Sequence, residues 1–137
     1  MNYGFVNQDQ LENIDKALKK DLIDIGVECV MLIDMAGNTI AKCDNGKCTV
    51  DTYAFAALAA GNYATVDAMA KLVGETEFSL LFHKGEKASI HFSKVNNDLL
   101  LITMFNRELS LGFLRLKVVE LIEKIRNICG QSKNDNT

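Results

Sequence analysis

Two of the four cysteines lie close together in the sequence and are the first residues that could carry chemistry. Cys43 and Cys48 are separated by Asp44-Asn45-Gly46-Lys47. This spacing is wider than the CxxC of redox proteins, and a structural zinc site would need two further ligands. Asp-Asn-Gly is also a common turn sequence. A thiol or metal protein that uses Cys43 and Cys48 is therefore one hypothesis, and a plain connecting loop is the alternative.

The two histidines fall in a predicted β-hairpin. Alternating apolar and polar residues predict strands over 77–83 and 88–95, joined by a turn at 84–87. If apolar residues pair across this hairpin, His83 and His91 share its more polar face. Two imidazoles could bind a metal or respond to pH. No carboxylate is expected to orient them and no third ligand is evident, so we predict no metal site and no cofactor.

Other sequence patterns bear on nucleotide chemistry. Gly46-Lys47 resembles the end of a phosphate-binding loop, but Ala41 and Cys48 break GxxxxGK[ST] at two positions. GxGxxG, HExxH and GxSxG are also absent from the sequence. Arg107 and Arg115 could reach a partner's phosphate as an arginine finger, or they are ordinary surface charges. The sequence therefore predicts no catalytic site of its own.

The elements that would position these residues follow the order α-β-β-α-β-β-β-α. Helices are predicted over 8–25, 51–73 and 109–129, and the remaining strands over 27–34, 39–43 and 99–105. Strands 27–34 and 99–105 are apolar on both faces, so we place them centrally in a five-stranded, mostly antiparallel sheet with helices on both sides. The predicted fold class is α+β, an α-β-α sandwich. We expect one domain over residues 1–130 and a short polar tail over 131–137.

The predicted helix 51–73 has two different faces. We expect the first to pack on the sheet; it consists of Phe55, Leu58, Ala59, Asn62, Val66, Met69 and Val73. The opposite face combines small alanines with a tyrosine and two charged residues: Tyr53, Ala56, Ala57, Ala60, Ala64, Asp67, Ala68 and Lys71. Alanine is a strong helix former, which is one explanation. The other is a helix–helix interface, most simply between two copies of the chain. Pairing with a second copy would also protect edge strand 77–83.

Composition excludes several classes of protein. The 137 residues are 48% hydrophobic and 24% charged, which is typical of a globular domain. The net charge of −3 argues against nucleic acid as the main partner. The sequence contains no apolar run long enough to cross a membrane and no signal-peptide pattern, so we expect no membrane insertion. Four cysteines in a chain of this length form no disulfide framework, and we expect a reducing cytoplasm.

Several local patterns, taken in order, resemble the Roadblock/LC7 (dynein light chain) family. The matching segments are Gly26-Val27-Glu28 before a strand that ends at Asp34, Met35-Ala36-Gly37-Asn38, Ile40-Ala41, the alanine-rich run 56–61, the hairpin 77–95 and residues 106–116. The likeness covers residues 8–129 and is greatest to the bacterial MglB-type branch. It implies a profilin-like three-layer fold with the sheet order 2-1-5-4-3.

The resemblance also implies a function. Members of the MglB-type branch form homodimers through the middle helix and the third strand, here 51–73 and 77–83. The dimer binds a small Ras-like GTPase across the paired helices and stimulates GTP hydrolysis by reshaping the switch regions, without an arginine finger. The eight residues of the alanine-rich face would form this platform. A scaffold that binds without accelerating hydrolysis is the alternative. Because only residues 131–137 follow the last helix, we expect no contact with the GTPase through a C-terminal extension.

Overall fold

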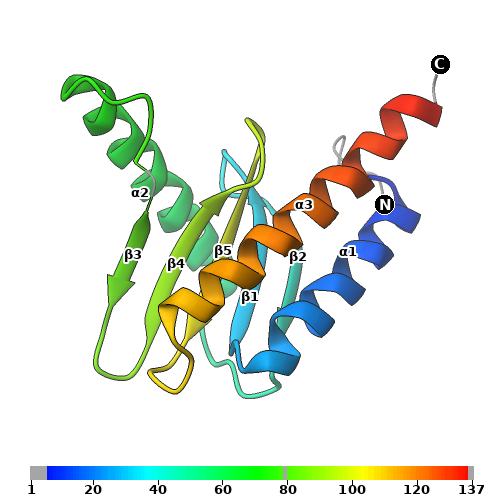
Figure 1. The fold of residues 1–137 in the computed structure, drawn as a ribbon, viewed down its shortest axis with the longest axis horizontal. Helices are drawn as coiled ribbons and strands as arrows, with labels where there is room; N and C mark the ends of the chain where they lie inside the picture. Colours follow the sequence, from blue (N-terminus) through cyan, green and yellow to red (C-terminus); the bar gives the residue numbers. More distant parts are fainter. Residues whose placement is uncertain (1–5, 79, 136–137) are drawn as a thin grey trace.

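The computed structural model describes residues 6–78 and 80–135, with side chains up to residue 130. Five strands form one sheet (Figure 1). The strands are β1 (Cys29–Asp34), β2 (Thr39–Asp44), β3 (Leu81–Lys84), β4 (Ser89–Lys94) and β5 (Leu99–Phe105). The helices are α1 (Gln8–Asp21), α2 (Thr52–Leu72) and α3 (Leu111–Asp135), with a short 3-10 helix, η1, at Ile23–Ile25.

The order of the strands confirms the predicted fold. The sheet runs β2-β1-β5-β4-β3, and each neighbouring pair is antiparallel. α2 covers one face, and α1 and α3 lie side by side on the other (Figure 1). The result is the predicted three-layer α-β-α sandwich.

Two hydrophobic cores explain why β1 and β5 are almost entirely apolar. Val30, Leu32 and Leu101 point into the core beneath α1 and α3. Met31 and Ile102 point into the core beneath α2. Because successive side chains of a strand alternate between the faces of a sheet, a strand covered on both sides needs apolar residues at nearly every position.

Local signals set the helix starts. The Asn7 side chain accepts from the Gln10 N–H, and the Gln10 side chain accepts from the Asn7 N–H, which forms a complete capping box for α1. The Asp51 side chain accepts from the Ala54 N–H at 3.1 Å and caps α2. These two caps position the N-termini of helices on opposite faces of the sheet.

Several element boundaries differ from the prediction; α1, for example, ends at Asp21 rather than at residue 25. β3 begins at Leu81 rather than at residue 77, and residue 79 lies outside the described residues. α3 continues to Asp135, so most of the predicted tail is helical, while residues 136–137 lie outside the described part. Gly130 follows the predicted end of the helix, and a helix can continue through one glycine. In the described residues, no helix has both the length and the apolar character needed to cross a membrane.

The turn between β1 and β2 approaches α2 closely, and glycine is required there. Gly37 has φ +92°, and a Cβ at this position would lie 3.0 Å from the Ala57 Cα. Gly26 has φ +116° but no atom would lie within 4 Å of its Cβ, so it provides a matched control.

We predict that Gly37→Ala lowers stability more than Gly26→Ala. Both substitutions force an alanine into the left-handed half of φ space, which costs about 1–2 kcal/mol. Gly37→Ala must in addition push α2 away from the turn. Urea unfolding of both variants measures the difference, and equal losses would contradict the close approach.

Candidate functional site

The face of α2 that meets the sheet is made of small residues. Ala56, Ala59, Ala60 and Ala70 are buried, and Phe55 and Tyr63 are half-buried against the same core. The prediction that Ala56 and Ala60 face outward is therefore wrong. Alanine side chains let the helix backbone approach the sheet and the Gly37 turn closely, and this close packing decides the orientation of the helix.

The larger side chains of α2 correspondingly point outward. Leu58 is 74% exposed and Leu72 is 86% exposed, and Met69 and Val73 are also exposed. The prediction that Leu58, Met69 and Val73 pack on the sheet is therefore wrong. Helix α2 carries apolar residues around most of its circumference, so one face meets the sheet and another lies open in a single chain.

The remaining residues of the predicted platform have side chains that are exposed or half-buried. Tyr53 is 84% exposed, and Ala57, Ala64, Ala68 and Lys71 are exposed. Asp67 is half-buried, and Lys71 Nζ lies 3.1 Å from its Oδ2. A role of these residues in an interface stays a prediction.

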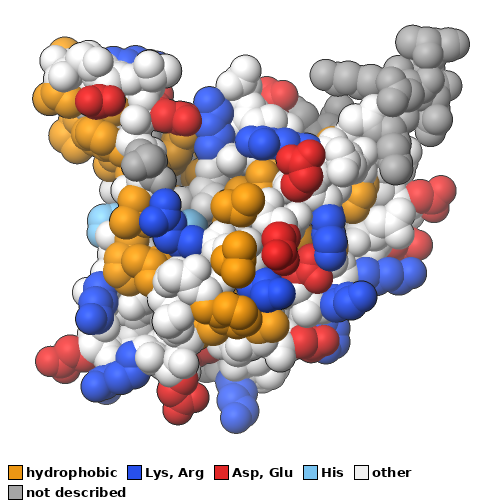
Figure 2. Space-filling view, viewed as in Figure 1, with side chains coloured by type: hydrophobic (Ala, Val, Ile, Leu, Met, Phe, Trp, Pro, Cys, Tyr) orange, Lys and Arg blue, Asp and Glu red, His pale blue; other side chains and the backbone are white. Residues whose placement is uncertain are grey.

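An apolar surface extends from α2 to the segment that leads into β3. We call it the α2–β3 surface; it consists of Leu58, Met69, Leu72, Val73, Phe78 and Leu80. Figure 2 shows hydrophobic side chains gathered over the end of α2 and along β3, and Figure 1 shows that α2 projects beyond the sheet there. β3 is also an edge strand. Soluble monomers rarely leave contiguous apolar area and an edge strand open together.

A hollow of about 190 Å³ separates α2 from β3 and β4. Its walls include Tyr63, Glu77, Phe78 and Leu81. Burial raises the pKa of the Tyr63 hydroxyl, and the carboxylates of Asp67 and Glu77 raise it further. Charged residues of both signs, Asp67, Lys71, Glu77 and Lys94, therefore lie beside the apolar α2–β3 surface, and a polar rim around an apolar centre is the usual arrangement of a protein interface.

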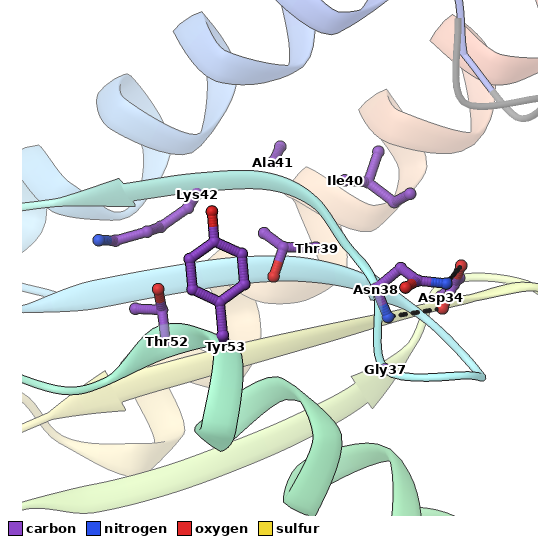
Figure 3. A pocket seen from close by; sticks show the side chains of 9 residues that line it. All are labelled: Asp34, Gly37, Asn38, Thr39, Ile40, Ala41, Lys42, Thr52 and Tyr53. Carbon is purple, nitrogen blue, oxygen red and sulfur yellow. Dashed lines mark hydrogen bonds between the residues drawn. The ribbon is translucent and has the colours of Figure 1, made fainter.

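A second hollow, of about 750 Å³, lies between β2 and the first turn of α2 (Figure 3). Tyr53 borders the hollow from α2 and Lys42 borders it from β2, while Asp34 lies at the β1–β2 turn. The Asp34 carboxylate accepts from the Ala36 and Asn38 N–H groups at 3.0 and 2.8 Å and from the Asn38 side chain. Since the turn itself uses this carboxylate, the hollow offers no free acid for catalysis.

The histidines do not share a face, contrary to the prediction. In the hairpin, Phe82 lies opposite His91, and His83 lies opposite Ile90. His91 is buried on the α3 side, with Nδ1 3.3 Å from the Ser93 Oγ, whereas exposed His83 packs edge-on against Phe92. The pair therefore cannot hold one metal ion.

A two-residue loop sets this register. Gly85 N–H donates to the Ala88 carbonyl at 2.9 Å, which leaves Glu86 and Lys87 as the loop. This turn shifts the strand pairing by one residue from the predicted register, so Phe82 lies on the α3 side of the sheet. There the ring of Phe82 stacks on the ring of Phe105, with the centroids 5.9 Å apart. Both faces of the sheet are covered, so the apolar pattern alone allowed either register.

The surroundings of His91 disfavour its charged form. Burial lowers the pKa of His91 to about 4, and the nearby Arg115 guanidinium contributes to the same shift. Arg107 donates from Nη2 to the Glu86 carbonyl at 3.1 Å and ties the hairpin loop to the end of β5. Both arginines are exposed, and Arg115 lies on α3, across the sheet from α2. A role of either one as an arginine finger stays a prediction.

The sheet separates the two cysteines that are close in sequence. Cys43 packs in the core beneath α1, and Cys48 packs in the core beneath α2. The hypothesis of a site built from Cys43 and Cys48 is therefore wrong in its geometry. Among the described residues, no three metal-binding side chains come together.

The comparisons with known proteins agree with this geometry. The model of the Roadblock/LC7 domain matches residues 20–105. A structure described as MglB with tetrameric arrangement shares 23% identity at a TM-score of 0.84, over 92% of this chain and 94% of that one. Gliding protein MglB from Thermus thermophilus shares 24% identity at 0.83, over 92% and 95%. MglB from Myxococcus xanthus shares 29% identity at 0.80, over 92% and 94%. No curated protein sequence matches the chain significantly.

Proposed function

Because the chain belongs to the Roadblock/LC7 domain family, we propose that it is a homodimeric regulator of a small Ras-like GTPase. The α2–β3 surface is the observation that carries this proposal. It combines an exposed apolar helix face with an open edge strand, and a second copy of the chain could cover both at once.

The GTPase would bind across the two paired α2 helices. Tyr53, Asp67 and Lys71 are suited to polar contacts at the rim, and the exposed alanines Ala57, Ala64 and Ala68 allow close approach of a partner. The protein would accelerate GTP hydrolysis by binding the reactive arrangement of the switch regions more tightly than the resting one. Neither Arg107 nor Arg115 is required to act as an arginine finger, and the chain has no catalytic site of its own in this proposal.

We predict that the protein increases the rate of phosphate release from a small Ras-like GTPase of the same organism. Tyr53→Ala combined with Lys71→Glu should reduce this stimulation by about tenfold or more, because both side chains are exposed on α2 and a loss of about 1.4 kcal/mol is tenfold. Single-turnover hydrolysis measures the effect. Val119→Glu, on the exposed face of α3, is the control and should leave the stimulation unchanged.

A scaffold without activating function is the second candidate, since the same fold supports both roles. Binding of the GTPase with an unchanged hydrolysis rate would favour the scaffold. Absence of both binding and stimulation would contradict the proposed function. A cytoplasmic location and the absence of nucleic acid partners are part of the proposal.

A further inference from the structure

Strand β2 forms the edge of the sheet farthest from β3, and the main chain of Lys42 is open along it. Lys42 lies opposite Met31 in the β1–β2 register, and the Asn45 N–H donates to the Glu28 carbonyl at 3.0 Å. Because bonded and non-bonded pairs alternate along an antiparallel ladder, this bond makes Lys42 and Met31 a non-bonded pair. The Lys42 N–H and carbonyl therefore point away from the sheet, and no described residue bonds to either of them.

The hollow of about 750 Å³ in Figure 3 borders this open edge. Its lining includes Thr39 and Lys42 from β2 and Thr52 and Tyr53 from the first turn of α2. These side chains offer three hydroxyl groups and one ammonium group. The acid of the lining, Asp34, is engaged by its own turn. Since the N-terminal end of a helix also favours negative charge, an acidic side chain suits this hollow best.

We propose that an extended peptide segment of a partner protein pairs with β2 as a sixth strand and places an acidic side chain opposite Lys42. The unpaired N–H and carbonyl of Lys42 would bond to the main chain of the peptide. Side chains opposite each other in a ladder share one face of the sheet, so the acidic residue reaches the hollow. Its two neighbours face the other side, beside Ala41 and Cys43, where small apolar side chains fit.

The charge of Lys42 and the position of β2 favour this occupant. Lys42 Nζ lies 3.4 Å from the Asp44 Oδ2, yet 36% of the Lys42 side chain is exposed, so the ammonium can contact a second carboxylate. The proposed dimer assigns the second copy of the chain to β3, and a further copy at β2 would extend the sheet from dimer to dimer. This choice of a peptide over another copy rests on the proposed function, whereas the open edge of β2 does not.

The experiment combines the full-length protein with the blocked peptide acetyl-Ser-Thr-Val-Glu-Val-Thr-Ser-amide and measures amide hydrogen exchange by NMR. In the free protein, we expect fast exchange at Lys42 and slow exchange at Cys43, which forms a bonded pair with Val30 of β1. The peptide at about 1 mM should slow the exchange at Lys42 by about fivefold or more and leave Cys43 unchanged. A peptide with lysine at its centre should bind about fivefold more weakly.

Two variants separate the main-chain contact from the charge contact. Lys42→Glu should reverse the preference, so that the lysine-centred peptide binds more tightly than the glutamate-centred one. Lys42→Pro should weaken both peptides by about tenfold or more, because proline lacks the N–H and is tolerated where an edge strand faces solvent. Far-UV circular dichroism checks that this variant folds; if it does not, the reversal by Lys42→Glu decides. Lys84→Glu, at the exposed lysine of the other edge strand, is the matched control and should change neither affinity.

Three results would overturn the proposal. The first is an unchanged exchange rate at Lys42 in the presence of the glutamate-centred peptide. The second is a peptide preference that Lys42→Glu does not reverse. The third is slow exchange at Lys42 in the free protein, together with assemblies larger than a dimer in sedimentation velocity, which would assign β2 to another copy of the chain. Peptide binding at Lys42 in a protein that neither dimerises nor stimulates a GTPase would contradict the proposed function and leave strand addition at β2 supported.

Discussion

A double substitution, Leu58→Glu with Leu72→Glu, is expected to convert the proposed dimer to a folded monomer. Both side chains are exposed in the single chain and lie on the α2–β3 surface. Burial of a leucine in an interface contributes about 1.5–3 kcal/mol, and the introduced glutamates would have to be buried without partners. The combined loss corresponds to an increase in the dimer Kd of at least about 100-fold.

Sedimentation velocity over a range of protein concentrations measures this change, and far-UV circular dichroism checks that α2 stays helical. Val119→Glu is the matched control, because Val119 is a 67% exposed apolar residue of α3, far from the α2–β3 surface. A dimer that survives the double substitution, or dissociates with Val119→Glu, would show that the contact lies elsewhere. Ala60→Glu is unsuitable for this test, since Ala60 is buried against the sheet and a glutamate there would disturb the fold.

The second large effect is a loss of stability in acid that His91 controls. The folded pKa of His91, about 4, lies below the ordinary value of 6.5, because burial and Arg115 disfavour the imidazolium. The contribution of neutral His91 is therefore intact above about pH 6.5 and is lost as the pH falls towards 4. A shift of this size corresponds to about 3 kcal/mol of unfolding free energy across that window.

Urea unfolding at pH 7, 6, 5 and 4, at one fixed protein concentration, measures this dependence. His91→Phe removes the titrating group while keeping a ring of similar size, so its stability should fall less steeply between pH 6.5 and 4. His83→Gln is the control, because His83 is exposed and should leave the slope unchanged. Identical slopes in the wild type and His91→Phe would exclude His91 as the cause.

Local sequence patterns are enough to predict the order of the elements and the layers they form. β1 and β5 are apolar at every position except Thr103 and the terminal Asp34, which places them in the centre of a sheet covered on both sides. Asn7 and Asp51 mark helix starts through hydrogen bonds made within one turn. These features are local, since a strand or a capped helix reveals its character through residues adjacent in sequence.

Packing between distant segments sets which surfaces face each other. Helix α2 is apolar on more than one side, so its periodicity could not tell whether Ala60 or Leu58 meets the sheet; the close approach of the Gly37 turn selects the alanines. The hairpin has apolar residues on both faces, with Phe82 on one and Leu81 and Ile90 on the other, and the bond from Gly85 to Ala88 sets which of two registers one residue apart is adopted. Cys48 packs against the core beneath α2 and Cys43 against the core beneath α1, because neighbours in sequence can lie on opposite sides of a sheet. Each of these choices depends on packing between segments distant in the chain, and local pattern carries no information about such packing.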